Sequence, residues 1–135
     1  MVVAVLPNLD KYGSSQVVEK LGTILKEEGI EAYLPDTIVA TDFKHAPEEE
    51  LYKLADVIIT IGGDGTIIRY AKRAAQDHKP VLGINAGRMG YLANLEQNEL
   101  GLVAKLKNND YFTERRMMLS VTVTENGETI GEYNA

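Results

Sequence analysis

Asp56-Val57-Ile58-Ile59-Thr60-Ile61-Gly62-Gly63-Asp64-Gly65-Thr66 is the stretch of sequence that decides the fold. Residues 56–61 form an apolar, mostly β-branched run, which predicts a strand buried on both faces. Apolar residues then recur at helical spacing, which predicts a helix over residues 66–76. A glycine-rich turn therefore joins a buried strand directly to a helix, an order typical of α/β proteins with a parallel sheet.

The segments on either side repeat this alternation. Further strands are predicted at residues 2–6, 30–34 and 81–84, and further helices at residues 14–28, 48–55 and 96–107. Ser14 or Ser15 is expected to cap the first helix and Gly29 to end it. Within the long connection of residues 35–47, Ile38 and Val39 could form a short strand. The pattern predicts an open, Rossmann-like, mostly parallel sheet with helices on both faces.

The last residues have a different character. Residues 117–125 alternate around Val121 and Val123, Asn126-Gly127 is a strong hairpin signal, and residues 129–133 read as the return strand. A lone hairpin is marginally stable in water. We therefore expect residues 1–115 to form an α/β nucleotide-binding domain, and residues 116–135 to begin a truncated, β-rich C-terminal domain.

Composition narrows the class of partner. With 14 basic and 20 acidic side chains the net charge is 14 − 20 = −6, which argues against a nucleic-acid partner. The sequence has no cysteine, so disulfides and a cysteine nucleophile are excluded. The apolar run after Met1 is too short for a signal peptide, and no stretch approaches the length of a membrane span. We expect a cytoplasmic protein with no membrane partner.

The glycine turn has the features of a phosphate site. Ligands of open α/β sheets bind at the carboxyl ends of the strands, where this turn lies. Glycines let the backbone approach a phosphate, and the N-terminus of the following helix favours an anion. Asp64 would repel phosphate, so it needs another role: it could accept a proton from an attacking hydroxyl, hold Mg²⁺, or merely cap the helix in a tight turn.

A second glycine-bearing turn, residues 85–92, follows the strand at residues 81–84. Adjacent strands would bring both turns to one edge of the sheet. Asn85 offers a donor and an acceptor to a nucleotide, and Tyr91 offers either a ring for a base or a core or interdomain contact. Arg69 could reach a phosphate or lie on the solvated surface. Neither a Walker A motif nor a G-x-G-x-x-G motif is present.

Residues 59–66 followed by residues 80–92 resemble the NAD kinase family, whose members use ATP or polyphosphate. Pro7-Asn8 and residues 115–119 add to this resemblance, which covers essentially the whole chain. It implies transfer of a phosphoryl group to the 2′-hydroxyl of the adenosine ribose of NAD, giving NADP. It also implies Mg²⁺ or another divalent ion as cofactor, and a homo-oligomer at full length. The site residues that it implies are Asp64 as proton acceptor, Gly62, Gly63, Gly65 and Thr66 at the donor phosphates and adenosine ribose, Arg69 at the nucleotide, and Gly90 and Tyr91 beside the adenine.

The resemblance also implies something further along the chain. Family members continue into a β-rich domain that begins with an Asn-Glu or Asn-Asp pair, and this pair grips NAD. The sequence ends at Tyr133-Asn134-Ala135, about where that pair is expected. We therefore expect this chain alone to bind NAD poorly and to show little kinase activity. The alternatives are a non-catalytic interaction module of the same fold and a lipid kinase of the same superfamily.

Overall fold

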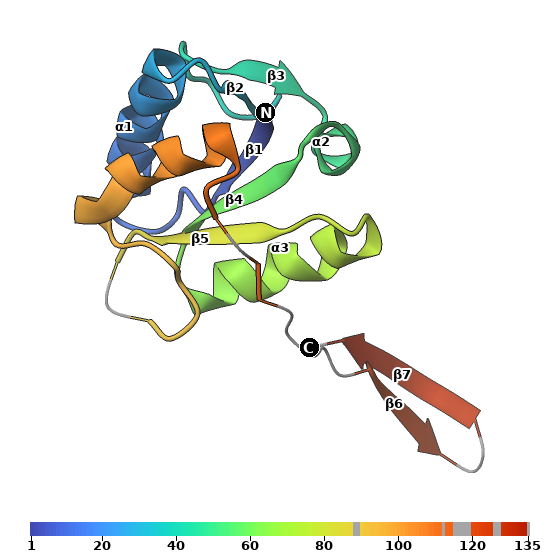
Figure 1. The fold of residues 1–135 in the computed structure, drawn as a ribbon. Coiled ribbons are helices and arrows are strands. Elements are labelled where there is room, and N and C mark those ends of the chain that lie inside the picture. The colour runs from blue at the N-terminus through green and yellow to red at the C-terminus, as the bar shows by residue number, and fades with distance from the viewer. Residues whose placement is uncertain (88–89, 112, 115–119, 126–127, 135) are drawn as a thin grey trace.

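A computed structural model describes residues 1–87, 90–111, 113–114, 120–125 and 128–134. Five parallel strands form one sheet in the order β3-β2-β1-β4-β5 (Figure 1). The elements of this body are β1 (Val2–Pro7), α1 (Ser14–Glu27), β2 (Glu31–Pro35), β3 (Lys44–Ala46), α2 (Glu48–Leu54), β4 (Val57–Gly62), α3 (Asp64–Gln76), β5 (Val81–Asn85) and the 3₁₀ helix η1 (Gln97–Asn108). The α/β fold expected from the sequence is confirmed.

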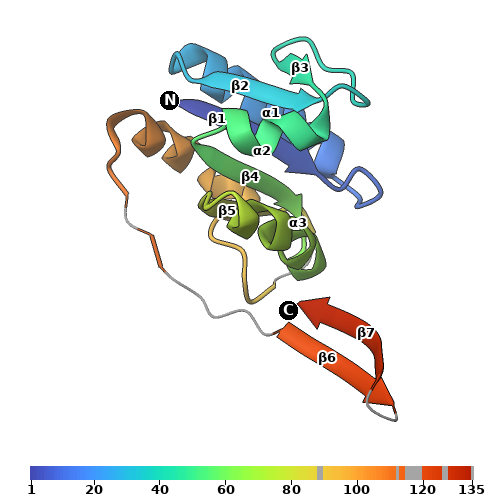
Figure 2. The ribbon, with the colours of Figure 1, turned by 90° about the vertical axis from the view of Figure 1, so that its right-hand side faces the viewer.

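Helices cover both faces of the sheet, and each face has its own core (Figure 2). Alternate residues of β1 supply the two cores: Val3 and Val5 pack with α1 and η1, whereas Ala4 and Leu6 pack with α2 and α3. All six residues of β4 are buried. The continuous apolar runs in the sequence follow from this arrangement, because a strand between two helical layers has no solvent face.

The order of the strands creates a crevice. From β1 the chain moves to β2 and β3 on one side, and then returns to β4 and β5 on the other. Pro7 lies opposite Ile61, and Gly62 lies opposite Asn85, so β1, β4 and β5 end at the same edge. The loops after β1 and β4 leave this edge toward opposite sides of the sheet. Open α/β sheets bind ligands in the crevice between two such loops.

The strands β6 (Ser120–Glu125) and β7 (Glu128–Asn134) form an antiparallel hairpin in which Ser120 lies opposite Asn134. Both views show this hairpin apart from the five-stranded sheet (Figures 1 and 2). The hairpin that the sequence predicts is therefore present, whereas its expected Asn126-Gly127 turn and residues 115–119 lie outside the described residues. The boundary at residue 115 remains a prediction.

Two local predictions are wrong. The third strand is β3, paired with β2, and not residues 38–39. The Ile38 amide instead donates to the Pro35 carbonyl at 3.0 Å, which makes a turn after β2, and Val39 is 96% exposed. No serine side chain caps α1: its N-cap is Gly13, with a φ of 89° that glycine tolerates.

Two other helix ends are informative. Gly29 follows α1 with a φ of 71°, as expected for the glycine that ends a helix. The helix α3 begins at Asp64, two residues earlier than the apolar spacing predicts, so the aspartate belongs to the first helical turn. Within the described residues, no helix is long and apolar enough to cross a membrane.

Candidate active site

The glycine turn is shaped by contacts within itself and with the second loop. Gly62 is the last residue of β4, and Gly63 is the extended N-cap of α3. A Cβ at Gly62 would overlap the buried hydroxyl side chain of Thr66. The Gly62 carbonyl also accepts a hydrogen bond from the Ala86 amide at 3.0 Å. Glycine at position 62 thus lets the turn close over Thr66 while it stays attached to the loop after β5.

Asp64 links the two loops. Its Oδ2 accepts a hydrogen bond from the Tyr91 amide at 2.9 Å, and its Oδ1 accepts one from the Leu92 amide at 3.0 Å. A Cβ at Gly90 would overlap this carboxylate, so glycine there allows the loop to approach. The described hydrogen bonds of the Asp64 carboxylate go to the second loop and not to its own helix. They argue against the interpretation that Asp64 merely caps α3.

The same contacts fix the charge of Asp64. The hydrogen bonds from Tyr91 and Leu92, in that order, lower the pKa of its carboxyl below the ordinary value of 3.8, partial burial opposes them, and the charge of Lys11 adds to the lowering. Amide donors stabilise the ionised form in particular. Asp64 is therefore a carboxylate at neutral pH, able to accept a proton or to bind a cation.

Asn85 holds the second loop from inside. Its side chain is fully buried, its Nδ2 donates to a Glu96 carboxylate oxygen at 3.1 Å, and its Oδ1 accepts from the Gly87 amide at 3.3 Å. Beyond the loop, Leu95 pairs with Ile84 beside β5. These bonds hold residues 86–87 and 94–95 beside the end of β5. They explain why Tyr91 and Leu92 reach Asp64, and they give Asn85 a part in building the site.

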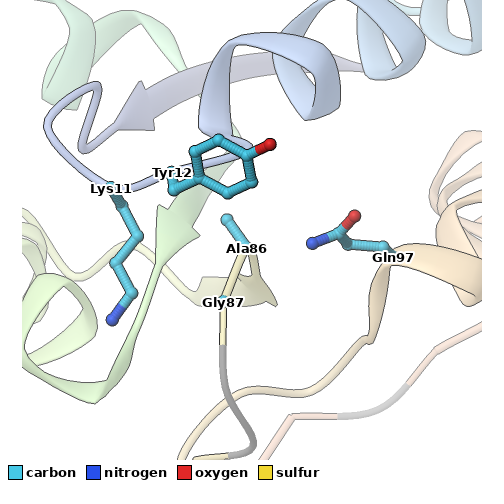
Figure 3. A pocket seen from close by; sticks show the side chains of 5 residues that line it. All are labelled: Lys11, Tyr12, Ala86, Gly87 and Gln97. Carbon is cyan, nitrogen blue, oxygen red and sulfur yellow. The ribbon is translucent and has the colours of Figure 1, made fainter.

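The loop after β1 contributes a residue that the sequence analysis missed. Lys11 extends between the two glycine turns: a Cβ at Gly63 would lie 3.0 Å from its Nζ, and a Cβ at Gly87 would lie 2.6 Å from its Cε. A hollow of about 520 Å³ opens here, lined by Lys11, Tyr12, Ala86, Gly87 and Gln97 (Figure 3). The sequence does show a lysine just after a buried strand. That lysine can be assigned to the site only once β1 is known to lie beside β4.

The remaining predicted residues have different surroundings. The Tyr91 side chain is 97% exposed, so it makes no core contact within the described chain and its ring is free to meet a base or another domain. Arg69 is exposed, and its guanidinium lies over the Tyr70 ring at 5.3 Å. A Cβ at Gly65 would meet nothing within 4 Å. The structure thus gathers Gly62, Gly63, Asp64, Thr66 and Gly90 tightly, and leaves Gly65, Arg69 and Tyr91 open to solvent.

The described residues gather no three His, Asp or Glu side chains that could hold a metal ion by themselves. Mg²⁺ is commonly held by one or two carboxylates together with substrate phosphates. A divalent ion at this edge would fit that second arrangement, with Asp64 as the candidate ligand from the chain.

A parallel sheet with two glycine turns and an ionised carboxylate at its switch point is typical of Rossmann-like α/β domains, a class that binds ligands at the carboxyl ends of its strands. Residues 3–112 match the ATP-NAD kinase N-terminal domain, and the chain belongs to the NAD kinase family.

Individual relatives agree with this family. The chain is 34% identical over 137 residues to an NAD kinase of Natranaerobius thermophilus, covering 98% of the chain and 48% of that protein. It is 34% identical over 135 residues to an NAD kinase of Pseudomonas fluorescens, covering 94% and 46%. The fold is also that of yeast NADH kinase complexed with NADH, with a TM-score of 0.73, 17% identity, and coverage of 100% and 44%. The chain spans about half the length of the curated relatives that it matches.

Proposed function

We propose that this chain is the part of an NAD kinase that carries the catalytic carboxylate, and that the kinase transfers a phosphoryl group from ATP or polyphosphate to the 2′-hydroxyl of the adenosine ribose of NAD. Family membership supports the substrate pair. The observation that carries the proposal is the geometry of Asp64, an ionised carboxylate held by two amides beside a glycine turn. Such a carboxylate suits a reaction that must remove a proton from an attacking hydroxyl.

The proposed step balances as follows. The 2′-oxygen of the acceptor forms a bond to the terminal phosphorus of the donor, the bond from that phosphorus to its bridging oxygen breaks, and the donor leaves shortened by one phosphoryl group. The hydroxyl proton passes to the Asp64 carboxylate. Because the pKa of Asp64 is lowered, the carboxylate is a weak base toward a free hydroxyl, and we expect the proton to transfer as the new bond forms.

In this proposal the glycines and the second loop position the donor phosphates and the base. In the first turn of α3 the Thr66 amide donates to the Gly63 carbonyl at 3.2 Å. The amides of Asp64 and Gly65 have no intrahelical partner by position, and Gly65 leaves open space beside them. A divalent ion would neutralise charge on the donor phosphates, with Asp64 as its candidate ligand. We expect the exposed ring of Tyr91 to stack on a base and the exposed side chain of Arg69 to bind a phosphate.

The activity of this chain alone is a separate proposal. The chain spans about half the length of its curated relatives, and the hollow of about 520 Å³ beside Lys11 and Gly87 is the place that we propose for the donor. We infer that residues 1–135 bind a phosphate donor and turn over NAD slowly. A non-catalytic interaction module would share the fold, but its binding to a partner would not require the Asp64 carboxylate.

The test joins residues 1–135 to the C-terminal half of the Natranaerobius thermophilus NAD kinase and measures NADP formation. Asp64→Asn should lower kcat by roughly 10²–10⁴-fold, because the amide keeps the size of the side chain and loses its basicity. Asp36→Asn, at an exposed position in the connection after β2, is the matched control and should leave kcat unchanged. A fusion that folds, makes NADP and keeps its rate with Asp64→Asn would show that Asp64 is not the base.

A further inference from the structure

Lys11 lines the crevice at the switch point of the sheet. It follows β1, and its side chain runs past Gly87 toward Gly63, at the start of α3 (Figure 3). Both glycines leave room for this path, since a Cβ at either position would meet the flexible end of the lysine side chain. The two glycine turns therefore leave room not only for a ligand but also for this one ammonium group.

The charge of Lys11 has no close partner in the described chain. Lys26 and Lys105 meet aspartates at 3.4 Å and 3.3 Å, and Lys44 meets Glu31. Among the described residues, no carboxylate lies within 4.0 Å of the Lys11 Nζ. Asp64 is near enough to feel its charge, but the Asp64 oxygens bind the amides of Tyr91 and Leu92. A half-buried lysine that lines a hollow, with no carboxylate partner among the described residues, favours an anionic ligand.

We propose that Lys11 binds the phosphate chain of the donor, next to the phosphoryl group that is transferred. This inference rests on the proposed function and adds a residue to the donor site. An anion on the Lys11 Nζ would lie beside Gly63 and the N-terminus of α3, one residue from Asp64. The transferred phosphorus must lie next to the attacking hydroxyl, and hence next to the carboxylate that takes its proton. The common ligand chemistry is a linear triphosphate, from a nucleotide or from inorganic polyphosphate.

The experiment is calorimetric titration of the 135-residue chain with tripolyphosphate and, separately, with ATP. Lys11→Gln should weaken binding of both by roughly tenfold or more, as for loss of a charge-assisted hydrogen bond. Lys11→Arg should retain most of the affinity because it keeps the charge. Lys20→Gln, an exposed lysine on α1, is the matched control and should bind like the original chain. Circular dichroism and thermal unfolding of each variant check that it folds.

The outcomes separate the two proposals. Equal binding by Lys11→Gln and the original chain would overturn the role of Lys11 and leave the proposed kinase reaction standing. Lys11-dependent binding of triphosphate, together with no NADP formation in the fused protein, would overturn the reaction and support the anion site. No binding of either probe by the original chain would overturn the donor site as a whole. Tighter binding of ATP than of tripolyphosphate would support a nucleotide donor, and equal binding would support the phosphate chain as the recognised element.

Discussion

Asp64 has a structural and a chemical role at once, and the two roles oppose each other. Its carboxylate fastens residues 91–92 to the start of α3 through two amide hydrogen bonds. The same bonds lower its pKa and so reduce its strength as a base. A substrate hydroxyl that bonds to Asp64 has to share the carboxylate with these amides or displace one of them. The second loop therefore sets both the position and the basicity of the proposed proton acceptor.

The titration of Asp64 gives a pH prediction. Because its pKa is lower in the folded chain than the ordinary 3.8, its ionised form stabilises the fold fully above that value. This contribution is lost as the pH falls through the lower, folded pKa. Carbon-13 NMR of the Asp64 carboxyl should thus give a midpoint below 3.8, and Lys11→Gln should raise it. A midpoint at or above 3.8 in the original chain would contradict the two hydrogen bonds.

At the scale of elements, the sequence predicts most of what local forces determine. The buried strands β1 and β4 and the helix α1 show in apolar runs and helical spacing, because each buries its own side chains. The position of β3 is missed because β3 is short and its pairing with β2 is non-local. Lys11 is missed for a similar reason: nothing near it in the sequence shows that β1 lies beside β4. Asp64 is found, but its bonds to the second loop are not.

Two glycines at the junction of β4 and α3 should respond in opposite ways to substitution by alanine, so each variant is a control for the other. Gly65→Ala places a Cβ in open space within the helix, so the free energy of unfolding should rise by about 0.5–1 kcal/mol or stay unchanged. In Gly62→Ala the new Cβ would overlap the buried side chain of Thr66, so the free energy of unfolding should fall by about 1–3 kcal/mol. Urea unfolding measures both changes.

The pair also separates stability from ligand access. If donor phosphates approach the first turn of α3 closely, Gly65→Ala should weaken tripolyphosphate binding although the variant is no less stable. Unchanged binding in a stable Gly65→Ala variant would mean that the phosphates lie away from this residue. A Gly62→Ala variant as stable as the original chain would contradict the packing of the turn against Thr66.

At the scale of the whole molecule, exposed aromatic residues gather where the described strands end. Tyr12, in the loop after β1, is 94% exposed, and Tyr91, in the loop after β5, is 97% exposed. The sheet beneath them has complete cores on both faces, so these rings are not needed for its packing. Large exposed rings at a ligand-binding edge suit contacts with a base or with a further domain. The chain spans about half the length of the curated relatives that it matches.

This arrangement leads to a prediction about how the work of the enzyme is divided. Residues 1–135 alone should bind tripolyphosphate about as well as the fusion with the C-terminal half of the Natranaerobius thermophilus relative, because Lys11, the glycine turn and Asp64 all lie in this chain. NADP formation by the chain alone should be slower by roughly a hundredfold or more, since a hydroxyl that is not held in line with the donor loses the advantage of positioning. Parallel titration and coupled NADP assays measure both. Turnover by the chain alone at a rate near that of the fusion would mean that residues 1–135 position NAD without help.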